Sequence, residues 1–504
     1  MEDAALTAAL VKPDAYPHSV DDVRVIETHI SRVFLAGDFA YKVRKPVRFD
    51  FLDFSTAQAR SDDCQTELRL NRRVAPALYL DVVPIVVGDT AGSVKVEGAG
   101  VPLEYAVKMR RFAQQDLFSE MLTANRLQVS HIDALAVRLA RFHRDQPCAR
   151  LEQGYGTLAR VRATLDECLG GIEHLDDRSG LSTEVSRLVR TRAAALGDAI
   201  QSRLQSGHVR ECHGDLHLGN IVWLDGEPMP FDCLEFDPGL RWIDTISDVA
   251  FPFMDLLHQG RQDLAYRLLN AYLQHSGDYA GLKLLPLYVA MRALVRARVM
   301  LERAHQQSNT SDASMSATRV ECRKLLALAW RVLVRRAATL VVMHGLSGSG
   351  KSTVAAEISE TVAMVRVRSD VERQRLRHGA GATDGRYDRR ETDRTYERLR
   401  AICRIGCSAG FAMIADATFL SCRQRDRFMA LARRLGVPFF IVQCEAPVDT
   451  LRTRILARAH SGQDASEADC ATLAWQLRVQ EPLTEAQEAC AVSASRFIPP
   501  FLPA

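Results

Sequence analysis

The stretch GLSGSGKS at residues 345–352 constrains the fold more than any other part of this 504-residue chain. It matches the pattern G-x-x-x-x-G-K-S, follows the apolar run 338–343 and precedes a helical pattern over about 352–363. A strand, a glycine-rich turn and a helix in this order let backbone N–H groups and the positive end of the helix face a phosphate group. The pattern therefore predicts a nucleotide site.

Each residue type in this loop has a part in binding a triphosphate. Glycine removes the side chains that would keep backbone N–H groups away from the phosphates. Lys351 is expected to contact the β- and γ-phosphates, and the hydroxyl of Ser352 is expected to ligate Mg²⁺. The expected nucleotide-binding residues of the loop are Gly345, Ser347, Gly348, Ser349, Gly350, Lys351, Ser352 and Thr353.

Apolar runs alternate with helical patterns after this loop. Residues 411–414 and 438–442 are the next such runs along the chain. An alternating strand–helix order implies a parallel sheet with helices on both faces. We therefore expect an α/β P-loop NTPase domain over 337–504.

A polar segment separates this domain from the rest of the chain. Residues 305–318 contain no Leu, Ile, Val or aromatic side chain, which indicates a linker. A helix over about 319–336 is expected to extend from it into the second domain. The predicted division is a domain over 1–305, a linker and connecting helix over 306–336, and the P-loop domain.

The N-terminal part begins with strand patterns and becomes helical later. Residues 32–43 have the pattern of a hairpin, with a connection at residues 36–38 that contains glycine and aspartate. A helix is predicted over about 56–73, strands follow over 80–87 and 103–109, and the pattern is helical from about residue 130. A small strand-rich lobe is therefore expected to precede a larger helical lobe.

The stretch HGDLHLGN at residues 213–220 is a second pattern for phosphate chemistry, unrelated to the first. Phosphoryl transfer needs a carboxylate that orients or deprotonates the acceptor hydroxyl, and groups that hold Mg²⁺ against the phosphates. Asp215 is the expected base and Asn220 an expected metal ligand. Asp232 follows a predicted pair of strands, where its carboxylate can complete the Mg²⁺ site. The alternative for the two histidines of the stretch is a structural place in the core.

On this stretch, on Phe231-Asp232 and on WIDTISDVA at residues 242–250, the chain resembles the aminoglycoside phosphotransferase and choline kinase group of kinase-like enzymes. The likeness covers about residues 20–305. It implies a two-lobed α+β protein-kinase-like domain that binds ATP and transfers phosphate to a small hydroxyl compound. It also implies that Asp248 is a structural carboxylate that anchors the catalytic loop.

The same resemblance assigns roles in the small lobe. In kinase-like folds the strand after the hairpin carries the lysine that contacts ATP phosphates, and the next helix carries its ion-pair partner. By this resemblance Lys42 and Glu67 are the expected pair of the ATP site. Lys45 is the alternative for the first role, and Asp63 for the second.

Two acids are candidates for chemistry in the P-loop domain. Asp370 follows the apolar residues 364–365 within Arg368-Ser369-Asp370, and Asp416 ends the run that begins at residue 411. The segment from Gly345 to about residue 483 resembles the kinase domains grouped with gluconate kinase, zeta toxin and phage polynucleotide kinase. By that resemblance Asp370 is the acceptor base and Asp416 the metal-organising acid. The exchange of these roles, or an N-cap role for Asp370, is the alternative.

Arginines are expected around the phosphates and the acceptor. Arg454 and Arg458 lie four residues apart on one helical face, and residues 461–466 are the expected tip of a lid that closes over ATP. Between Arg366 and Arg404 there are twelve arginines against seven acids, which fits an anionic acceptor. The alternative in both places is a solvated or salt-bridged helix face.

The composition excludes several classes of protein. A formal net charge of +3 implies no general attraction to nucleic acid or to an anionic membrane. No apolar run approaches the roughly 20 residues that cross a bilayer, and the first residues lack the features of an export signal. The twelve cysteines lie singly, which predicts free thiols in a reducing cytoplasm.

The sequence therefore predicts a cytoplasmic bifunctional phosphotransferase with two sites for ATP and Mg²⁺, acting on hydroxyl groups of small molecules. It resembles a family of fused proteins described as phosphotransferase plus AAA-type ATP-binding protein. The alternative is a regulatory or toxin-like protein in which only the P-loop domain binds or turns over ATP. Nucleic acid and membrane partners are not expected.

Overall fold

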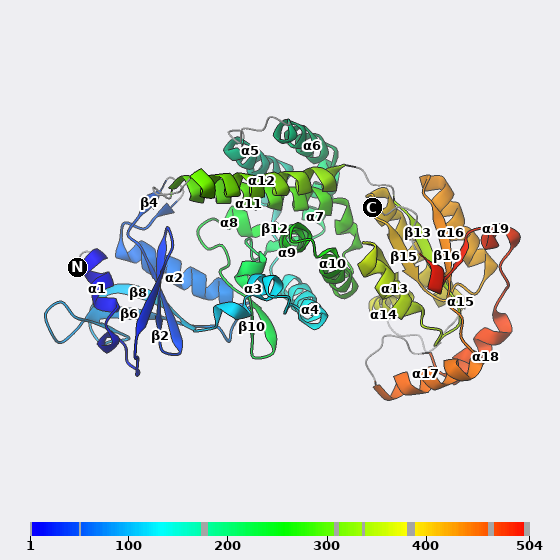
Figure 1. Ribbon diagram of the computed structural model, residues 1–504, viewed down its shortest axis with the longest axis horizontal. Helices are drawn as coiled ribbons and strands as arrows, with labels where there is room; N and C mark the ends of the chain where they lie inside the picture. Colours follow the sequence, from blue (N-terminus) through cyan, green and yellow to red (C-terminus); the bar gives the residue numbers. More distant parts are fainter. Residues whose placement is uncertain are drawn as a thin grey trace. The chain divides into compact units, whose positions relative to one another are not determined.

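The computed structural model describes residues 3–49, 52–172, 180–306, 312–334, 338–380, 389–461 and 468–497. By their contacts the residues form two compact units (Figure 1). The first unit is Met1–Arg160 with Arg203–Pro252, and the second is Val161–Ser202 with Phe253–Ala504. The division into domains that we draw from the motifs stays a prediction.

The first unit contains a strand-rich lobe and the segments around the HGDLHLGN loop at residues 213–220. Its elements are α1 (Asp3–Leu10), η1 (Pro13–Ala15), β1 (Val23–Glu27), β2 (Ser31–Ala36), β3 (Phe39–Arg44), β4 (Arg48–Phe49), β5 (Leu52–Asp53), α2 (Ala57–Arg72), β6 (Tyr79–Val87), β7 (Val94–Val96), β8 (Pro102–Arg110), η2 (Gln114–Asp116), α3 (Phe118–Thr123), α4 (Val129–Asp145), η3 (Leu151–Gln153), β9 (Val209–Glu211), η4 (Leu218–Asn220), β10 (Ile221–Leu224), β11 (Glu227–Pro230), α8 (Pro238–Arg241), β12 (Trp242–Asp244) and α9 (Thr245–His258), whose last turns lie in the second unit.

A six-stranded sheet in the order β1-β2-β3-β8-β6-β7 forms the small lobe. The expected hairpin is confirmed: β2 and β3 pair antiparallel with Ala36 opposite Phe39, so Gly37 and Asp38 form a two-residue connection. The expected helix is also confirmed as α2, and Thr56 is its N-cap, accepting a hydrogen bond from the Ala59 N–H.

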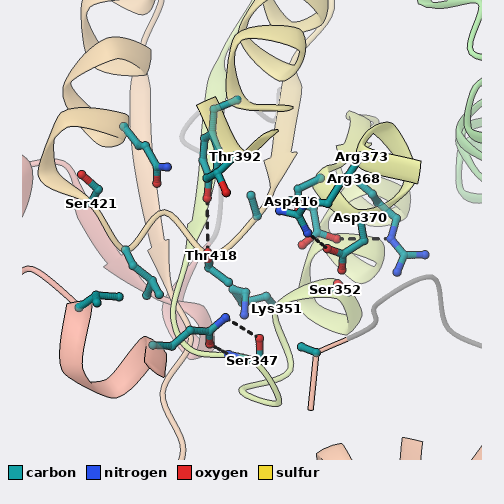
Figure 2. A pocket seen from close by; sticks show the side chains of 18 of the residues that line it. Ser347, Lys351, Ser352, Arg368, Asp370, Arg373, Thr392, Asp416, Thr418 and Ser421 are labelled. Carbon is teal, nitrogen blue, oxygen red and sulfur yellow. Dashed lines mark hydrogen bonds and ion pairs between the residues drawn. The ribbon is translucent and has the colours of Figure 1, made fainter. Parts of the chain in front are cut away.

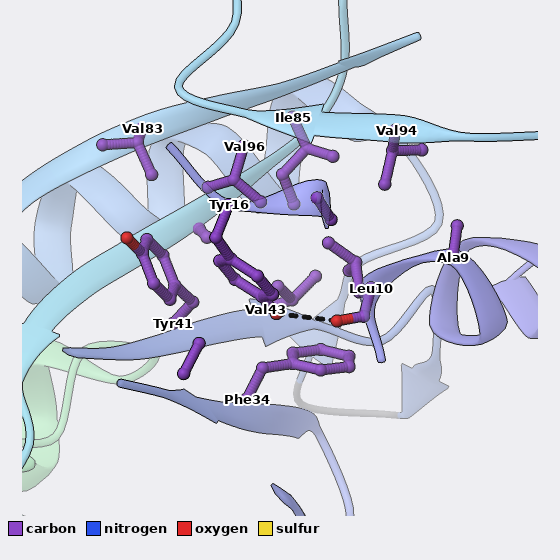
Figure 3. Packing of buried hydrophobic residues seen from close by; sticks show 13 residues of the cluster. Ala9, Leu10, Tyr16, Phe34, Tyr41, Val43, Val83, Ile85, Val94 and Val96 are labelled. Atoms are coloured by element: carbon purple, nitrogen blue, oxygen red, sulfur yellow. Dashed lines mark hydrogen bonds between the residues drawn. The ribbon is translucent and has the colours of Figure 1, made fainter. Parts of the chain in front are cut away.

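The two faces of this sheet have different partners because side chains alternate along each strand. On one face Tyr41 and Val43 pack with Phe34 and with Leu10 of α1 (Figure 3). Ala40, on the opposite face of β3, packs in a separate cluster with residues of α2. Lys42 has the parity of Ala40, so β3 directs this lysine toward α2.

The second unit combines helices of the middle of the chain with the P-loop sheet. Its elements are α5 (Leu158–Ile172, which begins in the first unit), α6 (Leu181–Ala195), α7 (Gly197–Gln205, which ends in the first unit), α10 (Gln262–Ser276), η5 (Tyr279–Lys283), α11 (Leu285–Gln306), α12 (Asp312–Leu333), β13 (Leu340–His344), α13 (Lys351–Thr361), β14 (Val365–Arg368), α14 (Ser369–Ala380), α15 (Arg389–Ser408), β15 (Met413–Asp416), α16 (Cys422–Leu435), β16 (Phe439–Gln443), α17 (Val448–Ser461), α18 (Cys470–Val479), α19 (Glu485–Glu488), β17 (Ala491–Ser493) and η6 (Ala494–Arg496).

The expected parallel sheet is confirmed. Five parallel strands lie in the order β14-β15-β13-β16-β17, with helices α13, α15 and α16 packed against them. The loop after β13 and the ends of β15 and β14 lie at the carboxyl edge of the sheet, where ligands bind in open parallel sheets. The connecting helix begins at Asp312, earlier than expected, and α12 packs along α11 because its apolar side chains need cover.

Two further expectations concern the surface and the cysteines. Among the described ranges no helix has the length and apolarity needed to cross a membrane. All twelve cysteines have free thiols, as the sequence predicts.

Arg425 in α16 is fully buried and joins the end of the chain to the loop after β15. Its guanidinium makes hydrogen bonds with all five of its N–H donors, at 2.6–3.2 Å. The acceptors are the backbone carbonyls of Phe419, Leu420, Glu481 and Pro482 and the Oε1 atom of Gln487.

We expect Arg425→Lys to destabilise the second unit by about 3 kcal/mol, because an ammonium cannot reach all of these carbonyls and leaves buried acceptors unpaired. Urea unfolding followed by circular dichroism measures the change. Arg434→Lys is the control, since Arg434 is exposed on the same helix, and it should change the free energy of unfolding by less than about 0.5 kcal/mol. Equal stability of the two variants would contradict this role of Arg425.

Candidate active sites

The first site is built around a lysine that contacts two carboxylates. The Lys42 Nζ atom lies 2.9 Å from Glu67 Oε1 and 2.6 Å from Asp232 Oδ1. Glu67 is fully buried, and the Lys42 side chain is 12% exposed. The structure therefore brings together Lys42 of β3, Glu67 of α2 and Asp232, which lies two residues after β11, as the resemblance to kinase-like enzymes implies.

The alternatives for this pair lie elsewhere. Lys45 contacts the Thr28 carbonyl at 2.5 Å and Glu27 at 2.7 Å, and neither is a residue of the predicted site. Asp63 faces Arg44 at 2.6 Å. In this geometry Lys42 and Glu67 have the expected positions, and their part in ATP binding stays a prediction.

Arg44 and Glu235 complete the site, and the sequence analysis misses both. Arg44 donates to Glu67 Oε2 at 2.7 Å and to Glu235 Oε1 at 2.5 Å, and it is almost fully buried. Their positions in the sequence could have indicated both residues. Arg44 is two residues after Lys42, on the same face of β3, and Glu235 is three residues after Asp232. Glu67 thus accepts from two cations through its two oxygens.

The carboxylates of this cluster outnumber its cations. Burial raises the pKa of Glu235 to about 7, against the attraction of Arg44. Burial also disfavours the charged form of Asp232, but Lys42 outweighs it and holds the pKa of this carboxyl below its usual value. Asp63 and Glu67 bring the carboxylates to four against two cations. Carboxylate oxygens in excess are suitable ligands for Mg²⁺.

Asp232 has a left-handed backbone, with φ = 63°. This conformation is rare for a residue other than glycine and costs of order 1 kcal/mol or more. The Tyr79 hydroxyl accepts from the Asp232 N–H at 3.2 Å and donates to Glu67 at 3.3 Å, which holds the turn in place. The strained turn carries the carboxylate to Lys42.

The HGDLHLGN loop at residues 213–220 is held by Asp248, as the resemblance implies. Its carboxylate accepts from the backbone N–H of His213 at 3.0 Å and of Gly214 at 2.9 Å, and it contacts His143 Nε2 at 3.1 Å. Asp248 is fully buried. Gly214 has φ = 88°, and a Cβ atom there would lie 2.8 Å from the Leu240 carbonyl, so the loop needs glycine.

Within the loop, Asp215 and Asn220 lie in contact. The Asn220 Nδ2 group donates to the Asp215 carbonyl at 3.0 Å and to its carboxylate at 3.2 Å. His213 is fully buried, burial lowers its pKa, and its ring bonds the Phe231 carbonyl at 2.9 Å. His213 is therefore a structural histidine of the core, the alternative that the sequence analysis left open. It joins the loop to the segment between β11 and Asp232.

The second site begins with the glycine-rich loop. Gly345, Gly348 and Gly350 have φ values of 144°, 84° and 92°. A Cβ atom at Gly345 would lie 2.2 Å from the Cys444 carbonyl, so no other residue fits there. The Lys351 Nζ atom donates to the Leu346 carbonyl of its own loop at 2.7 Å, and the lysine is 8% exposed.

Gln476 of α18 holds this loop, and sequence reasoning misses it because α18 is far along the chain. Its Oε1 atom accepts from the Ser347 N–H at 2.8 Å, and its Nε2 group donates to Ser347 Oγ at 3.0 Å (Figure 2). Arg454 of α17 donates to the Gly348 carbonyl at 3.3 Å. The side chain of Arg458 and residues 462–466 of the expected lid tip lie outside the described residues.

Asp416 lies at the carboxyl end of β15, beside the loop, and is 4% exposed. Its Oδ2 atom has no hydrogen-bond partner among the described residues, and the nearest guanidinium groups are those of Arg368 at 3.9 Å and Arg366 at 4.0 Å. A buried carboxylate oxygen without a donor is a suitable ligand for a hard cation. The Oγ atom of Ser349 is buried without a partner in the same way, which fits a phosphate oxygen.

A cavity of about 630 Å³ joins the loop to the acids. Lys351, Ser352, Asp370 and Asp416 all line it, and Figure 2 shows Asp370 and Asp416 close to Ser352. Asp370 lies in the first turn of α14, inside the helix, and contacts Arg373 at 3.3 Å. Among the described residues, seven cationic side chains and four carboxylates line the cavity. The structure therefore brings the predicted residues of the second site together.

Comparison with known proteins gives matches to both parts. Residues 340–483 match the family model described as an AAA domain. "Uncharacterized protein Rv2004c" of Mycobacterium tuberculosis is 33% identical over 472 residues, which cover 92% of this chain and 91% of that protein. An adenylyl-sulfate kinase of Myxococcus xanthus is 32% identical over 124 residues, 24% of this chain and 64% of that protein. A choline/ethanolamine kinase family protein from Mesorhizobium loti aligns with a TM-score of 0.38 and 15% identity, covering 65% of this chain and 99% of that one.

We expect Asp416→Asn to weaken Mg²⁺-ATP binding at the second site by about 10- to 100-fold, because the neutral amide is a poorer partner for the cation. Binding of ATP without Mg²⁺ should not weaken. Isothermal titration with and without Mg²⁺ measures both, in a Lys42→Met background in which we expect ATP binding at the first site to be lost. Asp393→Asn, which changes another acid of the same cavity, is the control. Unchanged Mg²⁺-ATP affinity in Asp416→Asn would assign the metal to Asp370 instead.

Proposed function

The chain belongs to the same family as the mycobacterial protein described above, and from the chemistry of its two sites we propose that it is a bifunctional ATP-dependent phosphotransferase. Each site would use Mg²⁺-ATP and transfer the γ-phosphate to a hydroxyl group of a small molecule. The cavity that joins Lys351 and Ser352 to Asp370 and Asp416 is the observation that supports this most directly. The twelve free thiols support a reducing compartment such as the cytoplasm.

In the second site, ATP phosphates would replace the contacts that the loop makes with itself. Lys351 would leave the Leu346 carbonyl and contact the phosphates, and the free Oγ of Ser349 would donate to a phosphate oxygen. Mg²⁺, bound through Ser352 and Asp416, supplies neutralisation of the phosphate charge. Arg454, at the cavity wall, would approach the phosphates from α17.

Asp370 would act on the acceptor. Its carboxylate accepts the proton of the acceptor hydroxyl as the oxygen bonds to the γ-phosphorus, the bond from that phosphorus to the β–γ bridging oxygen breaks, and ADP leaves. Arg373, which contacts Asp370 at 3.3 Å, would hold this carboxylate toward the cavity.

In the first site, Asp215 would take the acceptor proton in the same way. Lys42, fixed by Glu67, would contact the ATP phosphates and release Asp232 to the metal. Mg²⁺, bound through Asn220 and Asp232, would offset the excess of carboxylates in the cluster.

The acceptor of the second site is proposed to carry negative charge. Arg389 and Arg423 line the cavity on the side of α15 and α16, and in the described part of the chain neither makes an ion pair. Arg427 lines the same side and contacts Glu397 at 2.9 Å. Unpaired guanidinium groups at a cavity wall favour a carboxylate, phosphate or sulfate group on the acceptor.

We expect Asp215→Ala to abolish phosphate transfer to one acceptor and to leave ATP binding at the phosphate loop intact. Lys351→Ala should do the converse, because the two sites share no residue. Transfer from γ-labelled ATP to metabolites of a cell extract, separated by chromatography, measures both activities. Two products, each lost with one variant, support the proposal. ATP turnover that survives both substitutions together, or wild-type protein that labels nothing, would contradict it.

The charge of the acceptor is tested with Arg423→Glu. Reversal of this charge should raise the KM for the second site's acceptor at least about 10-fold and leave the KM for ATP unchanged, since an anion meets repulsion where it met attraction. Arg433→Glu on the exposed face of α16 is the control. An acceptor without negative charge, or an unchanged KM, would refute the anionic class.

A further inference from the structure

Strand β14 is the edge strand of the P-loop sheet. It ends at Arg368, two residues before Asp370, which the proposed function places at the acceptor hydroxyl. One side of it pairs with β15, where the Val365 N–H donates to the Ala412 carbonyl. The Met364 carbonyl and the Arg366 N–H point the other way, where another strand would lie. An open edge of this kind is normally covered by a further element.

The side chain of Asn270 in α10 takes the place of that missing strand. Its Nδ2 group donates to the Met364 carbonyl at 3.0 Å, and its Oδ1 atom accepts from the Arg366 N–H at 2.8 Å. A carboxamide has the donor and the acceptor of a peptide group in the same plane, so it can satisfy both edge groups at once. Asn270 is 8% exposed, so water does not compete for these bonds.

A second contact of α10 fixes the helix that follows β14. Arg375 of α14 donates to the Gln274 carbonyl near the end of α10 at 2.6 Å. The guanidinium lies over Gly277, where a Cβ atom would come within 2.8 Å of its Nε atom. The same arginine pairs with the fully buried Glu372, which also accepts from Arg398 of α15 at 3.1 Å.

The two contacts of α10 lie on either side of Arg368 and Asp370 along the chain. Arg366 is bound by Asn270, Arg375 is bound by the end of α10, and Arg368 and Asp370 lie between them and line the cavity. The Arg366 side chain also donates to the Ser352 carbonyl at 2.8 Å, so the backbone that Asn270 holds is connected to the phosphate loop helix.

We propose that α10 is part of the second active site, with Asn270 as the residue that positions β14 and therefore Asp370. This proposal rests on the proposed function of that site and goes beyond it. The P-loop kinase then includes α10, which our sequence division assigns to the preceding domain. Residues 337–504 would therefore not act as an independent kinase domain. Asn270, which touches no substrate, then determines where the Asp370 carboxylate lies relative to the acceptor hydroxyl. A displacement of about 1 Å at such a base lowers the rate about 100-fold.

Asn270→Leu tests the proposal, since it is close in size and lacks both hydrogen-bonding groups. Asn270→Asp keeps the acceptor for the Arg366 N–H and loses the donor, so it should give an intermediate effect. Arg267→Gln is the control on the same helix, because it removes the 2.7 Å contact of α10 with Glu360 of α13 and keeps both hydrogen bonds of Asn270. All variants are made in the full chain.

Two measurements are compared. Hydrogen exchange followed by mass spectrometry should be faster over residues 364–377 in Asn270→Leu and unchanged over 340–353. In an Asp215→Ala background, transfer from labelled ATP to the extract metabolites should fall about 100-fold in Asn270→Leu, with an unchanged KM for ATP. Asn270→Asp should lie between Asn270→Leu and the parent, and Arg267→Gln should match the parent.

The outcomes separate this proposal from the proposed function. Normal exchange over 364–377 in Asn270→Leu, or faster exchange throughout the second unit, would overturn the positioning role. Full transfer activity in Asn270→Leu would overturn it as well. If the parent protein labels no metabolite, the proposed function fails, and the exchange measurement alone still decides whether Asn270 holds β14.

Discussion

The ion pairs of Glu67 are the interaction on which the first site depends. This carboxylate is fully buried and accepts from Lys42 through one oxygen and from Arg44 through the other. A buried charge without partners costs several kcal/mol, so β3 and α2 are constrained to one relative position. The same cations reach Asp232 and Glu235, which places the loop after β11 against the sheet. The geometry of this cluster follows from the need to neutralise buried carboxylates.

In the second site, buried hydrogen bonds fix the relative positions of the elements. Arg425 joins distant parts of the chain through five bonds, Gln476 holds the start of the phosphate loop, and Asn270 covers the edge of β14. Each of these side chains satisfies backbone groups that would otherwise be buried without partners. Because the bonds are directional, they fix the position of the loops as well as stabilising them. Among the described residues, the Oδ2 atom of Asp416 at this cavity is buried without a hydrogen-bond partner.

Much of both sites could be predicted from sequence because their chemistry is local. The P-loop, the catalytic loop and the hairpin before Lys42 are each defined within about twenty residues, where backbone geometry follows directly from residue type. Asp416 could be found because it ends an apolar run. Arg44, Gln476 and Asn270 could not, because their partners are distant in sequence and an isolated Arg, Gln or Asn is ordinary on any helix or strand. Asp370 could be proposed because it follows an apolar run, while its position in the first turn of α14 rather than at the N-cap is known from the structure alone.

The sequence by itself determined two phosphate-handling motifs, the order of a strand-rich part before a P-loop sheet, and the identity of the acids. Only the tertiary structure decided that Lys42 rather than Lys45 meets Glu67, since both fit the spacing and only strand parity and burial separate them. It also decided that α10 lies against β14. An open strand edge requires a partner, but sequence does not say which element provides it, because any carboxamide or strand can satisfy the same two backbone groups.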